Sequence, residues 1–205
     1  MSSGNIKNVV FDIGNVIVRW APLEIVRLTF GEVAASEQLA KSIFQSDTWM
    51  ALNKGAISES EAKAQYKQAL DWSDLECERF FYYVKQSQIL VFGSVELLKR
   101  VKSAGYKVYA LTDNVHEIVA HLKSQYSFWP LFDGATVSAD LGLLKPQPEI
   151  YQSLLCQHKL QASETVFIDD MPYNVAGAKE QGISAIQFEN SQQCEAELKA
   201  LGLSF

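Results

Sequence analysis

Short apolar runs rich in β-branched residues alternate along the chain with longer amphipathic segments. The runs that predict strands cover residues 8–11, 107–111, 134–138, 165–168 and 184–187. The segments with helical periodicity between several of them cover residues 95–104, 115–124, 149–159 and 174–181, and a closing helix is expected over 195–201. Gly105 and Gly182 follow two of these segments, as glycines that end helices do. The alternation predicts an α/β fold built on a doubly wound parallel sheet.

The pattern changes between about residue 22 and residue 90, where no run predicts a strand. Helical periodicity continues through this stretch and is interrupted at Asn53-Lys54-Gly55. We interpret the stretch as a helical insertion after the first strand, with residues 1–18 and 91–205 forming the core and residues 19–90 forming a cap. The aromatic residues expected to form most of the interior of this cap are Trp20, Phe30, Phe44, Trp49, Trp72, Phe80 and Phe81.

Composition narrows the classes of protein that fit. The chain has 205 residues, enough for one α/β domain with an insertion, and its net charge of -6 argues against a nucleic-acid-binding surface. Cys77, Cys156 and Cys194 form no CxxC pair, which argues against a zinc site and fits a reducing compartment. No run is long and apolar enough to span a bilayer, and residues 1–7 carry no apolar signal core. We therefore expect a cytoplasmic monomer or weak homodimer without membrane or nucleic-acid partners.

Polar residues of complementary chemistry follow the predicted strands. Asp12, Thr112 and the pair Asp169-Asp170 stand at strand ends, and Lys145 lies in the loop over residues 143–148. In open parallel sheets, ligands bind outside the carboxyl ends of the strands, so these side chains are expected to converge. Asp12 could then attack phosphorus, the acidic pair could hold Mg²⁺, and Lys145 with Thr112 could bind phosphoryl oxygens. The pattern indicates phosphoryl transfer.

Four ordered motifs contain these residues, and together they resemble the motifs of the haloacid dehalogenase superfamily. The motifs are Phe11-Asp12-Ile13-Gly14-Asn15-Val16, Leu111-Thr112-Asp113-Asn114, Lys145-Pro146 and Asp169-Asp170. The resemblance covers nearly the whole chain, including a helical cap inserted after the first motif. It implies a Rossmann-like core, a phosphatase of this superfamily, Mg²⁺ as cofactor and a small phosphorylated molecule as substrate.

The resemblance also implies roles for residues around the phosphoryl group. Asp12 is expected to be the nucleophile that becomes an aspartyl phosphate. Thr112 is expected to bind the phosphoryl group with the backbone N–H groups of Asp113 and Asn114, and Lys145 to neutralise Asp12 and the phosphate.

Metal binding is expected at Asp12, at Asp170, at the backbone carbonyl of Gly14 and at Asp169, which acts either as a ligand or in support of the ligands. Asn174 is expected to orient the lysine or a metal-bound water. Candidates for contact with the rest of the substrate are Arg19, Trp20 and the loop at Asn53-Lys54-Gly55.

Gly14 departs from the phosphatase pattern, in which a second Asp follows the nucleophile by two residues as general acid and base. Such a group contributes roughly 10²–10⁴ in rate. Three explanations for the absence of this Asp remain open. The leaving group is good enough to depart with little protonation, another residue such as Asn15, His116 or a cap side chain positions a water, or the protein mainly binds its ligand. As a structural alternative, the glycine only permits a sharp turn.

The run from Phe11 to Val18 favours the first explanation, because it resembles α-D-glucose-1-phosphate phosphatases, which share an Asp-x-Gly-Asn-Val signature. We expect Mg²⁺-dependent hydrolysis of a small phosphomonoester such as a sugar 1-phosphate. The alternatives are a catalytically weak binding or regulatory protein, a phosphomutase, which Gly14 disfavours, and a 2-haloacid dehalogenase, which does not need the acidic pair.

Overall fold

Five parallel strands form the central sheet of the computed structural model, which describes residues 6–32 and 35–205. The strands are β1 (Asn8–Phe11), β2 (Lys107–Thr112), β3 (Gly134–Val137), β4 (Thr165–Asp169) and β5 (Ser184–Gln187), in the order β3-β2-β1-β4-β5. They are the five strands that the apolar runs predict. Residues 1–5, which belong to the segment expected to carry no signal core, lie outside the described residues.

The strand ends differ from the prediction by one residue at two functional positions. Thr112 pairs with Val137 and Asp169 pairs with Gln187. Each is therefore the last residue of its strand, whereas the sequence placed it directly after the strand. Asp12 does follow its strand, and its N–H donates to the Ile168 carbonyl at 2.9 Å. These polar residues therefore stand at one edge of the sheet.

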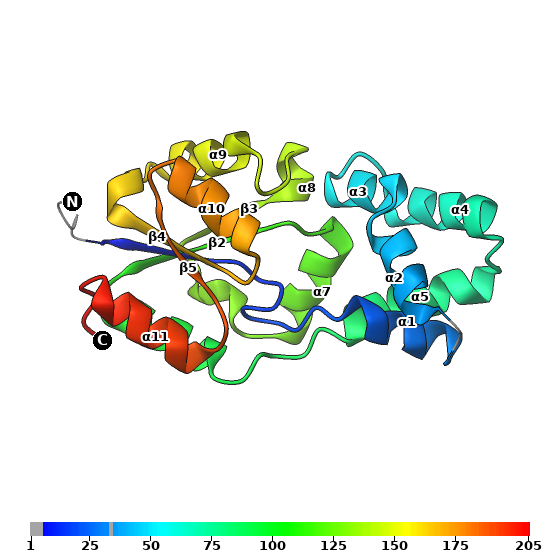
Figure 1. Cartoon of the computed structure of the whole chain (residues 1–205), viewed down its shortest axis with the longest axis horizontal. Coiled ribbons are helices and arrows are strands. Elements are labelled where there is room, and N and C mark those ends of the chain that lie inside the picture. The colour runs from blue at the N-terminus through cyan, green and yellow to red at the C-terminus, as the bar shows by residue number, and fades with distance from the viewer. Residues whose placement is uncertain (1–5, 33–34) are drawn as a thin grey trace.

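Helices cover both faces of the sheet, with α9 and α10 on one side and α11 on the other (Figure 1). The longer helices of this part are α6 (Ser94–Ser103), α7 (His116–Gln125), α9 (Pro148–His158), α10 (Pro172–Glu180) and α11 (Ser191–Ala200). The short ones are η1 (Trp129–Leu131), α8 (Ser138–Leu141) and η2 (Ala162–Glu164). The predicted doubly wound α/β class is confirmed.

Alternating residues of the central strand β1 fill the two layers of the core. Val10 packs in a cluster with Ile150 of α9 and Ala178 of α10. Val9 and Phe11 belong to the larger cluster on the opposite face. Successive side chains of a strand point to opposite faces, so a strand that is buried on both faces is expected to be apolar along its length. The residues of β1 after Asn8 follow this rule.

A helical lobe, residues 22–86, gathers at the end of the molecule beyond the carboxyl ends of the strands (Figure 1). Its helices are α1 (Pro22–Phe30), α2 (Ser36–Phe44), α3 (Asp47–Asn53), α4 (Glu59–Leu70) and α5 (Asp74–Gln86). Ser58 and Ser73 start α4 and α5 with capping boxes, which satisfy N–H groups that the first turn leaves unpaired. The lobe occupies the stretch in which the sequence predicts helices and no strand.

Aromatic rings fill the interior of the helical lobe. Phe80 lies at its centre, with ring centroids 5.3 Å from Trp72, 5.9 Å from Tyr66 and 6.3 Å from Trp49. Trp49 continues this network towards the strand ends, since its ring stacks at 5.7 Å on Trp20, which lies in the segment that leads from β1 into the lobe. The interior of the lobe therefore reaches the edge of the sheet where the polar residues stand.

The chain crosses between the sheet and the helical lobe twice, and further hydrogen bonds join the two parts. The crossings pair with each other, since Arg19 N–H donates to Ile89 O at 2.8 Å and Val91 N–H donates to Ile17 O at 2.9 Å. Beside the crossings, Ser138 Oγ donates to Asn53 O at 2.7 Å and Glu59 N–H donates to Glu117 Oε1 at 3.3 Å. Within the described residues, no helix has the length and apolar character needed to cross a membrane.

Candidate active site

Three carboxylates meet at the carboxyl ends of β1 and β4. Oxygens of Asp12, Asp169 and Asp170 lie within 4.8 Å of one another. The register explains this meeting, because β1 and β4 are adjacent parallel strands and Phe11 pairs with Ile168. Carboxylates at this distance repel one another unless a cation or a proton intervenes.

Among the described residues, Lys145 is the cation that contacts these carboxylates. Its Nζ lies 2.9 Å from Asp12 Oδ1 and 2.7 Å from Asp169 Oδ2, and its side chain is only 2% exposed. The backbone N–H of Lys145 donates to both carboxylate oxygens of Asp113 at 3.1 Å, which fixes the loop that delivers the side chain. One lysine leaves this cluster with excess negative charge, a donor set of hard oxygens that suits Mg²⁺.

Burial and mutual repulsion set the protonation of the cluster. Burial raises the pKa of Asp12 to about 8, which the charge of Lys145 opposes and the charge of Asp169 reinforces. Burial also raises the pKa of Asp170. Burial disfavours the Lys145 ammonium, but the charges of Asp12, Asp169 and Asp113 outweigh this and raise its pKa above the usual range. The lysine therefore stays cationic, and a bound divalent cation would favour the ionised form of Asp12.

Asp169 is held on all sides by hydrogen-bond donors. Beside Lys145, it accepts from Met171 N–H at 2.8 Å and from Asn174 Nδ2 at 3.0 and 3.1 Å. Asp170 accepts a single side-chain hydrogen bond, from Asn15. Asp12 and Asp170 thus keep more lone pairs free for a metal, while Asp169 orients the lysine.

Asn174 leaves one acceptor open at this cluster. Its Oδ1 is buried and has no hydrogen-bond partner among the described residues, while its backbone carbonyl accepts from Tyr151 Oη at 2.8 Å. A buried oxygen of this kind normally has a partner, and a water bound to the metal would provide one.

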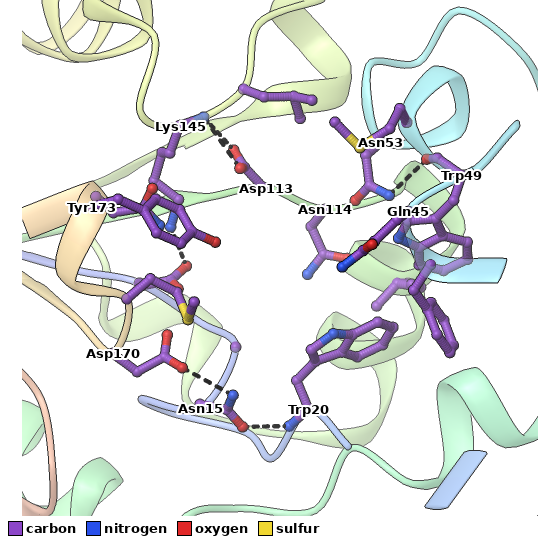
Figure 2. A pocket seen from close by; sticks show the side chains of 18 of the residues that line it. Asn15, Trp20, Gln45, Trp49, Asn53, Asp113, Asn114, Lys145, Asp170 and Tyr173 are labelled. Atoms are coloured by element: carbon purple, nitrogen blue, oxygen red, sulfur yellow. Dashed lines mark hydrogen bonds and ion pairs between the residues drawn. The ribbon is translucent and has the colours of Figure 1, made fainter. Parts of the chain in front are cut away.

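Asn15 connects the acidic cluster to the start of the helical lobe. Its Nδ2 donates to Asp170 Oδ2 at 3.0 Å, and its Oδ1 accepts from Trp20 N–H at 2.8 Å (Figure 2). Its φ of 53° is left-handed, a conformation that asparagine tolerates better than most residues. Gly14 has no such φ, and a Cβ there would meet only Trp20 Cβ at an ordinary 3.8 Å. The turn itself therefore does not require glycine at position 14.

A cavity of about 430 Å³ opens from this cluster between the sheet and the helical lobe (Figure 2). From the sheet side it is lined by Asp12, Gly14, Asn15, Asp113, Asn114, Lys145, Asp170, Met171, Tyr173 and Asn174. The remaining lining residues are Trp20, Phe44, Gln45, Trp49, Met50, Asn53, Gln88, Ile118 and Leu144. The volume lies within the range of small-molecule sites.

Several residues singled out from the sequence lie away from the cavity lining. Arg19 pairs with Glu24 at 2.6 Å, and both side chains are about two-fifths exposed. Thr112 is buried at the end of β2. His116 is exposed beside Asp140 at 3.4 Å, and Lys54 is not part of the lining. The described structure thus brings Trp20 and Asn53 to the cavity, but not Arg19 or Lys54.

Other lining residues carry no signal in the sequence that marks them as site residues. Among them are Gln45, Met50, Gln88, Met171 and Tyr173. They come from α2, α3, α5 and α10 or the turns beside them, and no motif or spacing connects them. Only the folding of the lobe against the strand ends brings them together.

Comparison with known families agrees with this geometry. The family described as haloacid dehalogenase-like hydrolase matches residues 6–182, which is most of the chain. The chain belongs to the haloacid dehalogenase-like hydrolases. The family and the enzyme class expected from the motifs are confirmed.

Two relatives match over nearly their whole length. A D-ribitol-5-phosphate phosphatase of Bacteroides thetaiotaomicron is 31% identical over 209 residues, covering 96% of this chain and 98% of that protein. A sesquiterpene phosphatase of Aspergillus oryzae is 27% identical over 195 residues, covering 95% and 96%.

Solved structures of the same family share the fold. An enzyme of this family from Bacteroides thetaiotaomicron, in complex with magnesium and inorganic phosphate, superimposes with a TM-score of 0.76 at 21% identity, covering 91% of this chain and 96% of that one. A family member from Porphyromonas gingivalis reaches 0.79 at 20% identity, covering 97% and 99%. At these identities the likeness concerns the fold.

Proposed function

We propose that this haloacid dehalogenase-like hydrolase is a Mg²⁺-dependent phosphatase of small phosphomonoesters, with Asp12 as the nucleophile. The observation that carries the proposal is the contact of Lys145 with Asp12 at 2.9 Å, inside a three-carboxylate cluster that opens on the cavity. The names of the two full-length relatives, both phosphatases, support it. An acidic cluster suited to a hard cation favours phosphoryl chemistry over carbon–halogen cleavage.

The first step would form a bond between an Asp12 oxygen and phosphorus while the bond from phosphorus to the leaving oxygen breaks. Lys145 would balance the negative charge on the phosphoryl oxygens and on Asp12. Water would then attack the aspartyl phosphate, which releases inorganic phosphate and returns the Asp12 carboxylate.

Asp12 and Asp170 would hold the metal, with the Gly14 carbonyl and with Asp169 and Asn174 in support. When bound, Mg²⁺ supplies positive charge that orients the phosphoryl group and stabilises charge transfer to the leaving oxygen. Asn15 would keep Asp170 oriented through its 3.0 Å hydrogen bond.

Leaving-group protonation decides the finer substrate class. Position 14 has no carboxylic acid, His116 lies outside the cavity lining, and the Asn15 amide already makes two hydrogen bonds. Neither Asn15 nor His116 is therefore free to act, so that only a cap side chain remains of the replacements that the sequence offers. The lack of an acid at position 14 favours esters whose leaving group departs with little protonation, such as sugar 1-phosphates. We propose in addition that the helical lobe acts as a cap that excludes bulk water during turnover.

Phosphate release from a panel of phosphomonoesters, with and without Mg²⁺, tests the function. The wild type should release phosphate only with Mg²⁺, and Asp12→Asn should lose release while keeping its circular dichroism spectrum. Asp140→Asn is the matched control, because Asp140 is exposed and lies outside the cavity lining.

Two outcomes would overturn the proposal. Undiminished release by a pure preparation of Asp12→Asn would exclude Asp12 as the nucleophile. Failure of the wild type to hydrolyse any ester, despite Mg²⁺-dependent binding of beryllofluoride, would instead indicate a binding protein.

A further inference from the structure

The cavity wall opposite the acidic cluster is aromatic. The rings of Trp20 and Trp49 are stacked, with centroids 5.7 Å apart and planes 20° apart. Phe44 meets both edge-on, at 5.2 and 4.9 Å. Figure 2 shows the two tryptophans across the cavity from Asp170 and Tyr173. A molecule attached to phosphorus at Asp12 would have to pass along this wall.

The same wall carries no positive charge. Of the described lining residues, only Lys145 is cationic, and its Nζ is already held between Asp12 and Asp169. Arg19, the nearest cation in sequence to Trp20, pairs with Glu24 outside the lining. A second anionic group on the substrate would lose hydration here without meeting a counter-charge, and it would also face the acidic cluster.

Two side-chain amides remain open beside the aromatic wall. In the described part of the chain, the Gln45 amide and Asn114 Nδ2 make no hydrogen bond, although both residues line the cavity (Figure 2). The other wall amides are engaged, since Asn53 Nδ2 donates to Trp49 O at 2.9 Å and Gln88 Nε2 donates to Val84 O at 3.0 Å. The open amides suit uncharged oxygen groups such as hydroxyls.

We propose that the preferred leaving group is uncharged and carries a ring-sized apolar face that packs on Trp20 and Trp49. Trp20 and Gln45 are then specificity-determining residues, and esters with a second phosphate or a carboxylate are rejected. The inference rests on the proposed phosphatase function and names its substrate class. A carbohydrate ring and a hydrocarbon ring both present such a face, so the experiment includes one of each.

The charge of the leaving group is tested with phenyl phosphate and 4-carboxyphenyl phosphate, which differ by one carboxylate. The wild type should prefer phenyl phosphate by about tenfold or more in kcat/KM. Gln45→Lys places a cation at an exposed wall position and should reduce that preference about three- to tenfold. Gln45→Met, of similar length but neutral, should leave the preference unchanged.

The ring face is tested with glucose 1-phosphate, phenyl phosphate and the acyclic glycerol 1-phosphate. Trp20→Leu should raise KM for the ring esters about two- to tenfold, the range expected from losing aromatic contact. It should change kcat/KM for glycerol 1-phosphate less than about twofold, and Trp20→Phe should restore part of the loss. Inhibition by inorganic phosphate, which lacks a leaving group, should stay constant across the variants.

The outcomes separate the inference from the function on which it rests. Mg²⁺-dependent release from all four esters at similar kcat/KM would overturn the inference and leave the phosphatase intact. An unchanged charge preference in Gln45→Lys, or equal losses on ring and acyclic esters in Trp20→Leu, would overturn it as well. No release from any ester by the wild type would overturn both.

Discussion

A close contact between the helical lobe and α8 makes Gly55 the most informative single position outside the acidic cluster. Gly55 follows α3 with a φ of +64°, and a Cβ built on it would lie 2.2 Å from Ala139 O and 3.0 Å from Ala139 C. The neighbouring Asn53 O accepts the hydrogen bond from Ser138 Oγ. Gly55→Ala should therefore push the end of α3 away from α8 and displace the cavity wall that α3 carries.

Two energetic contributions add at Gly55. Alanine in the left-handed region costs about 1–2 kcal/mol. Relieving a contact with backbone atoms costs about 1–3 kcal/mol more, as in overpacked cores. Gly142 has a similar φ of +72° but nothing within 4 Å of its built Cβ, so Gly142→Ala carries only the first cost. The difference of about 1–3 kcal/mol corresponds to about a five- to 150-fold change in the ratio of docked to undocked lobe.

The assay compares the two alanine variants for kcat/KM in phosphate release and for unfolding in urea. Gly55→Ala should fall below Gly142→Ala by up to about 150-fold in kcat/KM, mainly through KM, because only molecules with the lobe docked present the intact wall to the substrate. Equal kcat/KM and equal unfolding midpoints in the two variants would refute the reasoning. They would mean that the contact with Ala139 does not hold the lobe in place.

Three further predictions concern charge, orientation and pH. Lys145→Met leaves the acidic cluster without its lysine and should lower the free energy of unfolding by about 3–5 kcal/mol, with partial recovery on adding Mg²⁺; unchanged urea midpoints would contradict this. Asn15→Gly keeps the left-handed turn but loses the hydrogen bond to Asp170 and the one from Trp20 N–H, and because Asp170 is then no longer oriented, the Mg²⁺ concentration for half-maximal phosphate release should rise about tenfold. Burial lowers the pKa of His158 below its usual 6.5, so the unfolded state binds the proton more readily and stability should fall as the pH drops below that value. His158→Gln should lessen this loss, and identical pH profiles of the urea midpoints would exclude His158 as a source.

The strands and the acidic cluster were predictable because they depend on order along the chain. Each strand buried on two faces is a short apolar run, and parallel strands place their carboxyl ends at one edge. The positions of Asp12 and Asp169 after two such runs are therefore enough to predict that these carboxylates meet. Lys145 was expected to join them from the loop over residues 143–148, and the order of the family motifs supported that expectation.

The aromatic wall was not predictable in the same way. The tryptophans and phenylalanines of the lobe carry one signal, apolar residues at helical spacing, whether they face the interior or a cavity. Arg19 and Trp20 are adjacent in the sequence, but the structure places them differently. Arg19 donates its backbone N–H to Ile89 O and pairs with Glu24 away from the cavity lining, whereas Trp20 lines the cavity. Sequence position alone suggested both as substrate contacts.

By itself, the sequence determined the α/β class, the family and the chemistry of the strand ends. These follow from local periodicity and from residue types at fixed points of a parallel sheet. Only the tertiary structure decided which residues complete the cavity, because Gln45, Gln88 and Tyr173 come from separate elements whose packing no short pattern encodes. The acidic cluster thus depends on backbone topology, whereas the opposite wall of the cavity depends on how the helical lobe packs against the sheet.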